Sequence, residues 1–139
     1  MTEPAAIHVL VIDDSDIARE QMADRLKQAG FTVSMLASPI GATRVIAEQA
    51  IDVVVVDVQM PSIRGDRLAA LFKGNRRFAA LGVILVTGAN ETELSQLGAL
   101  AKADAVLSKA RLERLPETVN EVYRKYHSGN ASPARHART

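Results

Sequence analysis

Acidic, hydroxyl and amine side chains follow four of the apolar runs in this chain. They are Asp13 and Asp14 after HVLVI (8–12), Asp57 after DVVVV (52–56), Thr87 at the end of GVILVT (82–87) with Gly88 next, and Lys109 after DAVLS (104–108). If these runs are parallel strands, their carboxyl ends meet at one edge of a sheet, which is where open α/β sheets bind ligands. The sequence therefore predicts that the six residues converge.

Three carboxylates in one place repel one another, and without a cation some of their pKa values rise. Mg²⁺ relieves this repulsion because it prefers oxygen ligands and binds through one or two carboxylates plus a phosphate. A phosphoryl group in transfer carries negative charge on its equatorial oxygens. Lys109 can hold one such oxygen, Thr87 can donate to another, and Gly88 offers an N–H without bulk. Asp57 is then the nucleophile that forms an aspartyl phosphate.

Each residue also has a structural interpretation. Asp13 and Asp14 can begin a helix as a cap and a first-turn acid, and Asp57 can be the acid of a turn before Pro61. Thr87 is β-branched at a strand end, and a lysine such as Lys109 is most often a solvated surface charge. These interpretations are independent of one another, whereas a single site explains all five positions.

The elements that must position these side chains alternate along the chain. Strands are predicted at 8–12, 31–36, 52–56, 82–87 and 104–108. The first helix is predicted from a cap at Ser15 or Asp14 to Gly30, and the second from the Ser38-Pro39 cap to about Ala50. Further helices are predicted to start at Gly65 or Asp66 and at Asn90 or Glu91, and the last runs from Leu112 to Tyr126. Five strands alternating with five helices indicate a parallel sheet covered on both faces. The run at 52–56 is the most uniformly apolar, which favours the central position.

Composition fits one folded domain. The chain has 139 residues, 47% of them hydrophobic, a formal net charge of +1 and no cysteine. We expect the domain at 7–126, an N-terminal extension at 1–6, and a disordered tail or linker stub at 127–139. No apolar run approaches the ~20 residues that span a bilayer, and no strong charge favours nucleic acid. The expectation is a cytoplasmic domain without membrane insertion or nucleic-acid binding.

The chain resembles the receiver domain of two-component response regulators, the family of the bacterial chemotaxis regulator. The shared motifs are DD (13–14), DVQMPSIRG (57–65), TG (87–88) and SK (108–109), and the likeness covers residues 7 to 126. Each motif is short, but their order and spacing together are specific. The resemblance implies a flavodoxin-like, doubly wound five-stranded sheet with strand order 2-1-3-4-5.

The resemblance also implies roles for single residues. Asp57 would accept a phosphoryl group from a sensor histidine kinase or a histidine phosphotransfer protein. Asp14, Asp57 and the backbone carbonyl of Gln59 would ligate Mg²⁺, and Asp13 would act through water. Thr87 would move toward the phosphoryl group while Lys109 pairs with it. Such a domain catalyses its own phosphorylation and slow dephosphorylation, without being a metabolic enzyme, and then switches an unknown downstream partner or relays the phosphate.

Three positions depart from the family pattern. Ala110 replaces the proline that often follows the lysine through a cis bond, and because a cis bond before a non-proline residue costs about 3 kcal/mol we predict a trans bond. Val106 replaces an aromatic residue that changes orientation with Thr87, which puts the usual output surface in doubt. The positions that tune dephosphorylation in relatives are Gln59 and Ala89.

Two other functions remain open at this stage. A receiver-fold interaction module would bind its partner whatever the state of Asp57, an alternative that Val106 and Ala110 motivate. A phosphatase would use Asp14 as nucleophile and Asp16 as acid. The last helix carries charges of both signs on its exposed face, so a homodimer is possible.

Overall fold

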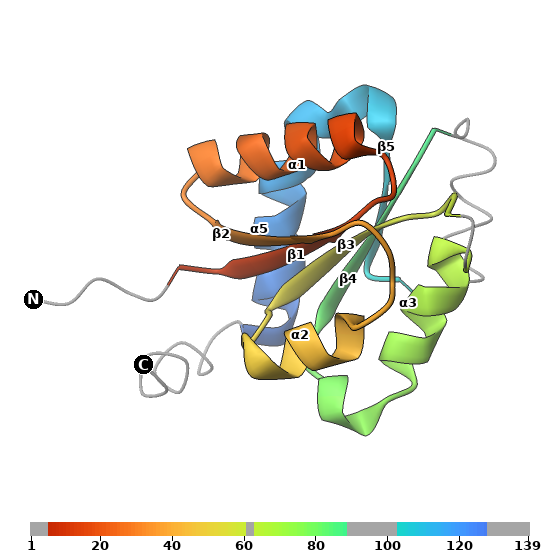
Figure 1. Cartoon of the computed structure of the whole chain (residues 1–139). Coiled ribbons are helices and arrows are strands. Elements are labelled where there is room, and N and C mark those ends of the chain that lie inside the picture. Colours follow the sequence, from red (N-terminus) through yellow and green to blue (C-terminus); the bar gives the residue numbers. More distant parts are fainter. Residues whose placement is uncertain (1–5, 61–62, 89–102, 128–139) are drawn as a thin grey trace, which may run out of the picture.

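Five parallel strands form one sheet in the computed structural model, which describes residues 6–60, 63–88 and 103–127 (Figure 1). The strands are β1 (His8–Ile12), β2 (Thr32–Leu36), β3 (Val53–Asp57), β4 (Gly82–Thr87) and β5 (Ala105–Ser108). Their order across the sheet is β2-β1-β3-β4-β5. This order confirms the doubly wound arrangement that the resemblance implied, and each predicted strand lies within one residue of the observed bounds.

Four α-helices cover the sheet within the described residues: α1 (Asp16–Gln28), α2 (Ala42–Glu48), α3 (Gly65–Lys73) and α5 (Leu115–His127). Helices α1 and α5 lie on one face, and α2 and α3 on the other (Figure 1). Two 3₁₀ segments, η1 (Arg76–Phe78) and η2 (Lys109–Arg114), precede β4 and α5. The fifth predicted helix, from Asn90 or Glu91, lies outside the described residues.

Strand β3 is central, as its uniform apolar sequence predicts. It pairs with β1 through Val53 to Val56 and with β4 over its whole length. Successive side chains of a strand point to opposite faces, so Val53 and Val55 enter the core beneath α1 and α5 while Val54 and Val56 enter the core beneath α2 and α3. All five residues of β3 are buried, which leaves Asp57 at the end of a rigid element.

Helix α1 begins at the predicted cap, whereas α2 does not. The Ser15 hydroxyl accepts a hydrogen bond from the N–H of Ala18 at 3.3 Å. Ser38 was expected to cap α2, but its hydroxyl accepts from the N–H of Ile40 in a turn, and α2 starts only at Ala42. Gly41 precedes α2 with φ +83°, a left-handed conformation that favours glycine. The prediction of a Ser38-Pro39 start is therefore wrong.

The C-terminal helix also begins later than predicted. Ser108 caps η2 by accepting from the N–H of Ala110 at 3.1 Å, and α5 starts at Leu115, three residues after the predicted Leu112. The predicted apolar stripe is buried at Leu115, Val119 and Val122. No peptide bond in the described segments is cis, so the bond between Lys109 and Ala110 is trans as predicted.

A polar network joins the two helical layers at the edge of the sheet where β4 and β5 begin. The buried carboxylate of Asp104 accepts from Lys125 at 2.7 Å, from the Tyr126 hydroxyl at 2.6 Å and from the N–H of Val83 at 2.8 Å. Lys73 of α3 lies 3.2 Å from the same carboxylate and also bonds the Tyr126 hydroxyl. These donors hold the pKa of Asp104 below its ordinary value despite burial. Burial and the hydrogen bond to the Asp104 carboxylate raise the pKa of Tyr126 to about 12.

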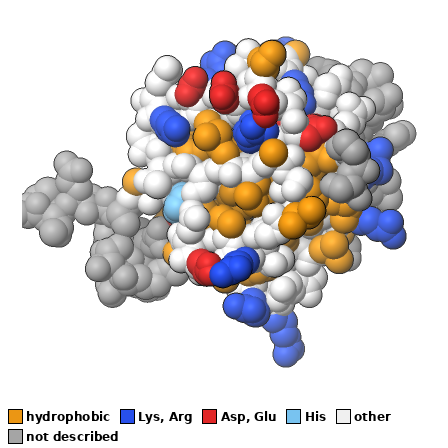
Figure 2. Space-filling model, viewed as in Figure 1, with side chains coloured by type: hydrophobic (Ala, Val, Ile, Leu, Met, Phe, Trp, Pro, Cys, Tyr) orange, Lys and Arg blue, Asp and Glu red, His pale blue; other side chains and the backbone are white. Residues whose placement is uncertain are grey.

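The face of the molecule that presents β2 combines an apolar centre with charged borders. In Figure 2 hydrophobic side chains occupy the middle of this face, between charged groups over α1 and over α2. Large exposed hydrophobic residues of the described segments include Met35 of β2 and Ile40 before α2. Within the described segments, no helix has the length and hydrophobicity needed to cross a membrane.

Candidate functional site

Three acids meet where β1 and β3 end. Asp13 and Asp14 directly follow β1, and Asp57 is the last residue of β3. Asp13 and Asp57 are buried, whereas Asp14 is exposed. One carboxylate oxygen from each lies within 4.8 Å of the others. The predicted convergence of these acids is therefore present, with two of them shielded from water and the third at the opening.

Lys109 supplies the cation of the cluster. It follows β5 as the first residue of η2, and its Nζ lies 3.3 Å from Oδ2 of Asp13 and 3.4 Å from Oδ1 of Asp57. The ammonium thus lies between the two buried carboxylates. Because β5 pairs with β4 and not with β3, the lysine side chain reaches Asp57 from two strands away.

Asp13 is held on several sides and still has a carboxylate oxygen to offer. Its Oδ1 accepts from the N–H of Ser15 at 2.9 Å, and its own N–H donates to the carbonyl of Leu36 at 3.1 Å. Its Oδ2 is buried and makes no hydrogen bond with any described residue, although the ion-pair contact to Lys109 remains. A buried acceptor without a donor is costly, so this oxygen suits a cation.

Burial is the main influence on Asp57 and raises the pKa of its carboxyl above the ordinary value. The neighbouring charge of Asp13 raises it further, whereas the N–H of Gln59, 3.2 Å from Oδ1, and the ammonium of Lys109 oppose the rise. The ionised form of Asp57 therefore lacks full compensation. A divalent cation at this position would supply the missing positive charge.

The donor set fits Mg²⁺. All three acids contribute oxygen, the ligand that Mg²⁺ prefers, and the exposed position of Asp14 leaves room for the waters that the ion retains. Of the predicted ligands, Gln59 is exposed and its N–H is directed to Asp57. Its backbone carbonyl remains a predicted ligand. The acids that would hold the ion thus come from two neighbouring strands.

The predicted switch residues border the same edge. Thr87 is buried at the end of β4, paired with Ser108 of β5, while Asp57 is paired with Val86, one residue earlier. Among the described residues, a Cβ at Gly88 would meet no atom within 4 Å. Val106 is half-buried in β5 and packs against the core beneath α2 and α3. Ala89 lies outside the described residues.

Two residues near the acids carry constraints that the motifs alone do not explain. A Cβ at Gly65 would lie 2.7 Å from the carbonyl carbon of Asp57 and closer still to its oxygen, so only glycine permits α3 to start against β3. Arg19 donates from Nη1 to the backbone carbonyl of Asp13 at 2.8 Å. The sequence signal for Gly65 is its place at the end of the DVQMPSIRG motif, whereas no sequence pattern indicates the contact of Arg19.

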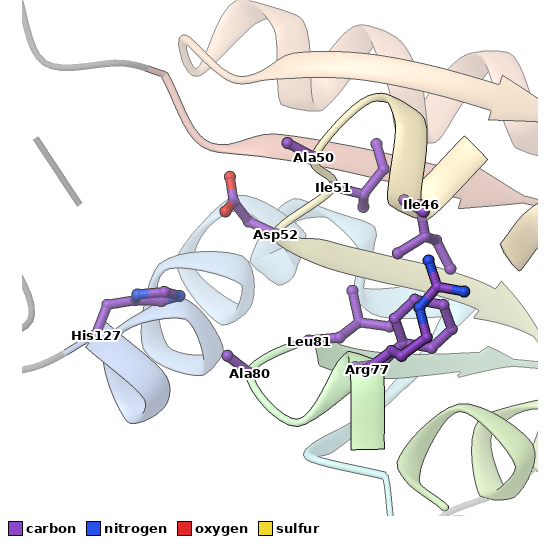
Figure 3. A pocket seen from close by; sticks show the side chains of 10 residues that line it. Ile46, Ala50, Ile51, Asp52, Arg77, Ala80, Leu81 and His127 are labelled. Carbon is purple, nitrogen blue, oxygen red and sulfur yellow. The ribbon is translucent and has the colours of Figure 1, made fainter. Parts of the chain in front are cut away.

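A separate cavity of about 360 Å³ lies near the start of β3, at the other end of that strand from Asp57 (Figure 3). Its lining combines apolar and polar groups, with Ile46 and Arg77 on one side and Asp52 and His127 on the other. The Asp52 carboxylate accepts from the N–H of His8 at 2.9 Å. None of the residues that line this cavity belongs to the acidic cluster of Asp13, Asp14 and Asp57.

The acids and the lysine gather at the carboxyl edge of a doubly wound α/β sheet, which is where open α/β sheets bind ligands. Comparison with known families makes the assignment specific: residues 9–120 match the model of the response regulator receiver domain. The chain belongs to this family, which confirms the resemblance drawn from the four motifs.

Individual relatives support the assignment. The chain is 26% identical over 102 residues to the TorCAD operon transcriptional regulatory protein TorR of Escherichia coli, covering 73% of this chain and 43% of TorR. It is 33% identical over 116 residues to the sensor histidine kinase RcsC of Salmonella typhi, covering 80% of this chain and 12% of RcsC. The chain therefore spans less than half the length of these relatives.

A solved structure of the chemotaxis protein CheY4 of Vibrio cholerae shows the same fold. It superposes with a TM-score of 0.75 at 26% identity and covers 85% of this chain and 99% of its own. The similarity to CheY4 thus extends over nearly all of that protein, in contrast to TorR and RcsC.

Proposed function

We propose that this chain is a phosphoacceptor domain in which Asp57 takes a phosphoryl group from a phosphohistidine in a Mg²⁺-dependent reaction. The observation that carries the proposal is the contact of Lys109 with both buried acids, at 3.3 Å to Asp13 and 3.4 Å to Asp57, beside the exposed Asp14. A sensor histidine kinase or a histidine phosphotransfer protein would be the donor, and the phosphorylated form would bind a downstream partner or pass the phosphate on.

The chemistry follows from the charges. An oxygen of Asp57 forms a bond to phosphorus as the phosphorus–nitrogen bond of the phosphohistidine breaks, and the leaving imidazole retains the bonding pair and is protonated from solvent. Asp14, Asp57 and the backbone carbonyl of Gln59, with Asp13 through water, would hold Mg²⁺, whose charge would offset that of the phosphoryl oxygens. Lys109 would exchange its contact with the carboxylates for one phosphoryl oxygen, and the Thr87 hydroxyl would donate to another.

The rigid base of Asp57 supports this assignment. Phosphoryl transfer depends mainly on positioning and electrostatic stabilisation, and β3 is buried along its whole length. Asp14 is exposed, and Asp16 forms an ion pair with Arg19. A phosphatase built on Asp14 and Asp16 would have to break that pair and would leave the buried Asp57 without a role, so the geometry favours Asp57 as nucleophile.

The test is direct modification. The chain is incubated with acetyl phosphate and MgCl₂, and intact-mass spectrometry is expected to show one added phosphoryl group that Asp57→Ala lacks. A beryllofluoride titration followed by NMR is expected to saturate wild type and not the variant. The proposal fails if wild type and Asp57→Ala behave alike in both measurements.

A further inference from the structure

We propose that Arg19 is a positioning residue of the acidic site, which acts through the backbone of Asp13 and touches neither metal nor phosphoryl group. The inference rests on the proposed function in taking Asp14 as a ligand of Mg²⁺ and Asp13 as acting on the ion through water. It assigns a role in metal binding to a residue of α1 outside the acidic motif itself.

The burial of Arg19 points to its role. Only 15% of its side chain is exposed, whereas Asp16, which contacts its Nη2, is 82% exposed. An ion pair with so exposed a partner contributes little to stability, so it does not account for a buried guanidinium. The other nitrogen, Nη1, donates to the carbonyl oxygen of the buried Asp13 at 2.8 Å.

The carbonyl of Asp13 depends on this donor. Asp13 is wholly buried, and in the described part of the chain no donor other than Arg19 reaches its carbonyl. A buried carbonyl without a donor is destabilised because the hydrogen bonds it made to water are not replaced. Loss of the guanidinium would therefore make the peptide that follows Asp13 turn toward another donor or toward water.

That peptide joins the two acids. The carbonyl of Asp13 and the N–H and Cα of Asp14 lie in one plane because the peptide bond does not rotate freely. Arg19 therefore restrains the direction in which Asp14 leaves the end of β1. The bond from the Ser15 N–H to Oδ1 of Asp13 closes a ring that also contains this peptide, but that bond does not reach the carbonyl oxygen, whose only donor among the described residues is Arg19.

Charge and position act in opposite directions here, which makes the proposal testable. The guanidinium is always protonated, so by charge alone its removal would strengthen Mg²⁺ binding. By position, its removal would weaken Mg²⁺ binding, as does loss of groups that orient metal ligands elsewhere, typically by about 10–100-fold. Mg²⁺ affinity is therefore measured without a phosphodonor. A rise in affinity would indicate the effect of charge, and a fall would indicate the effect of position.

The experiment compares wild type with Arg19→Ala in an NMR titration with MgCl₂ and no phosphodonor. Two controls accompany it. Arg25→Ala removes the same charge from an exposed position on the same helix, and Asp16→Ala removes the exposed partner of Arg19 while leaving the contact to Asp13. We expect Arg19→Ala to weaken Mg²⁺ binding by about tenfold or more and both controls to stay within about twofold of wild type.

A second measurement distinguishes a loss of metal-ligand positioning from a general loss of the fold or of phosphorylation. With acetyl phosphate, the Mg²⁺ concentration needed for half-maximal phosphorylation of Arg19→Ala should rise with its dissociation constant, while the rate at saturating Mg²⁺ returns to that of wild type. If circular dichroism shows that Arg19→Ala is unfolded, Arg19→Gln, which keeps part of the aliphatic stem, is measured instead with the same expectation.

Unchanged or tighter Mg²⁺ binding by the folded Arg19 variant would overturn the inference and leave the proposed function intact. Failure of wild type to take a phosphoryl group on Asp57, with the difference in Mg²⁺ affinity still present, would overturn the proposed function and support the positioning role. Equal weakening by Arg25→Ala would show that loss of an arginine of α1 weakens Mg²⁺ binding without any contact to Asp13, and would overturn the inference.

Discussion

The ammonium of Lys109 lies 3.4 Å from Oδ1 of Asp57, although Lys109 follows β5, which β4 separates from β3. The same nitrogen lies 3.3 Å from Oδ2 of Asp13. Lys109 therefore partly neutralises both buried acids, and in the proposed function the same ammonium also contacts the phosphoryl group.

Removal of this cation should impair phosphoryl transfer. We expect Lys109→Met to lower the rate of phosphorylation by acetyl phosphate by at least tenfold, because a hydrogen bond to a charged group contributes about 1.5–3 kcal/mol. The variant should also raise the pKa of Asp57 further, since Lys109 opposes the effect of burial. Lys27→Met, at an exposed position on α1, is the control. A rate within twofold of wild type would contradict the role of Lys109.

Replacement of the Asp57 carboxylate should stabilise the metal-free domain. Its pKa is raised in the folded state, so the folded chain binds this proton more tightly than the unfolded chain, and stability falls as pH rises through that pKa. In buffer with EDTA at pH 7, Asp57→Asn should therefore have a higher Tm than wild type, and the gap should narrow as the pH is lowered toward 4. A lower Tm for the variant at pH 7 would contradict the assigned effect of burial.

Two glycines at the site should respond differently to an added methyl group. A Cβ at Gly65 would overlap the carbonyl of Asp57, whereas a Cβ at Gly88 would meet nothing within 4 Å. We expect Gly65→Ala to lower the free energy of unfolding by about 1–3 kcal/mol and to slow phosphorylation, while Gly88→Ala leaves stability within about 0.5 kcal/mol. Urea denaturation measures both, and equal effects would refute the close approach at Gly65.

The stability that the network around Asp104 contributes should depend on pH. The pKa of Asp104 is lowered in the folded state, chiefly by its bonds to Lys125 and Tyr126. Its carboxylate therefore stabilises the fold at pH values above its ordinary pKa of 3.8, and this stabilisation is lost as the pH falls through the lowered pKa. We expect Asp104→Asn to lower the free energy of unfolding by about 2–4 kcal/mol at pH 7. The difference from wild type should shrink in urea titrations below pH 4, and a constant difference would refute the mechanism.

Much of the fold followed from local patterns. The bounds of β4 at 82–87 agree with the prediction because the apolar run begins at a glycine, which leaves few other positions for the ends of the strand. The start of α2 was misplaced because Ser38-Pro39 resembles a cap followed by a first-turn proline, whereas the left-handed Gly41 delays the helix. Such a backbone conformation depends on how the loop packs, and residue type alone does not reveal it.

The candidate site was predictable to the extent that its residues follow strands. Asp13, Asp57 and Lys109 were expected together because parallel strands share one edge. The burial of Arg19 and its bond to the Asp13 carbonyl were not predictable, because a side chain that bonds the backbone leaves no pairing of residue types in the sequence. The Asp104 network was missed for a similar reason, since Lys73 and Tyr126 come from helices on opposite faces of the sheet.

The complete burial of β3 also bears on how long a modification on Asp57 stays correctly aimed. Its backbone is paired on both sides and covered on both faces, so its amide protons should exchange with deuterium only when the whole domain unfolds. Loops and helix ends around the site can open far more often without moving this strand. Asp57, the proposed nucleophile, therefore lies on the strand that we expect to open last.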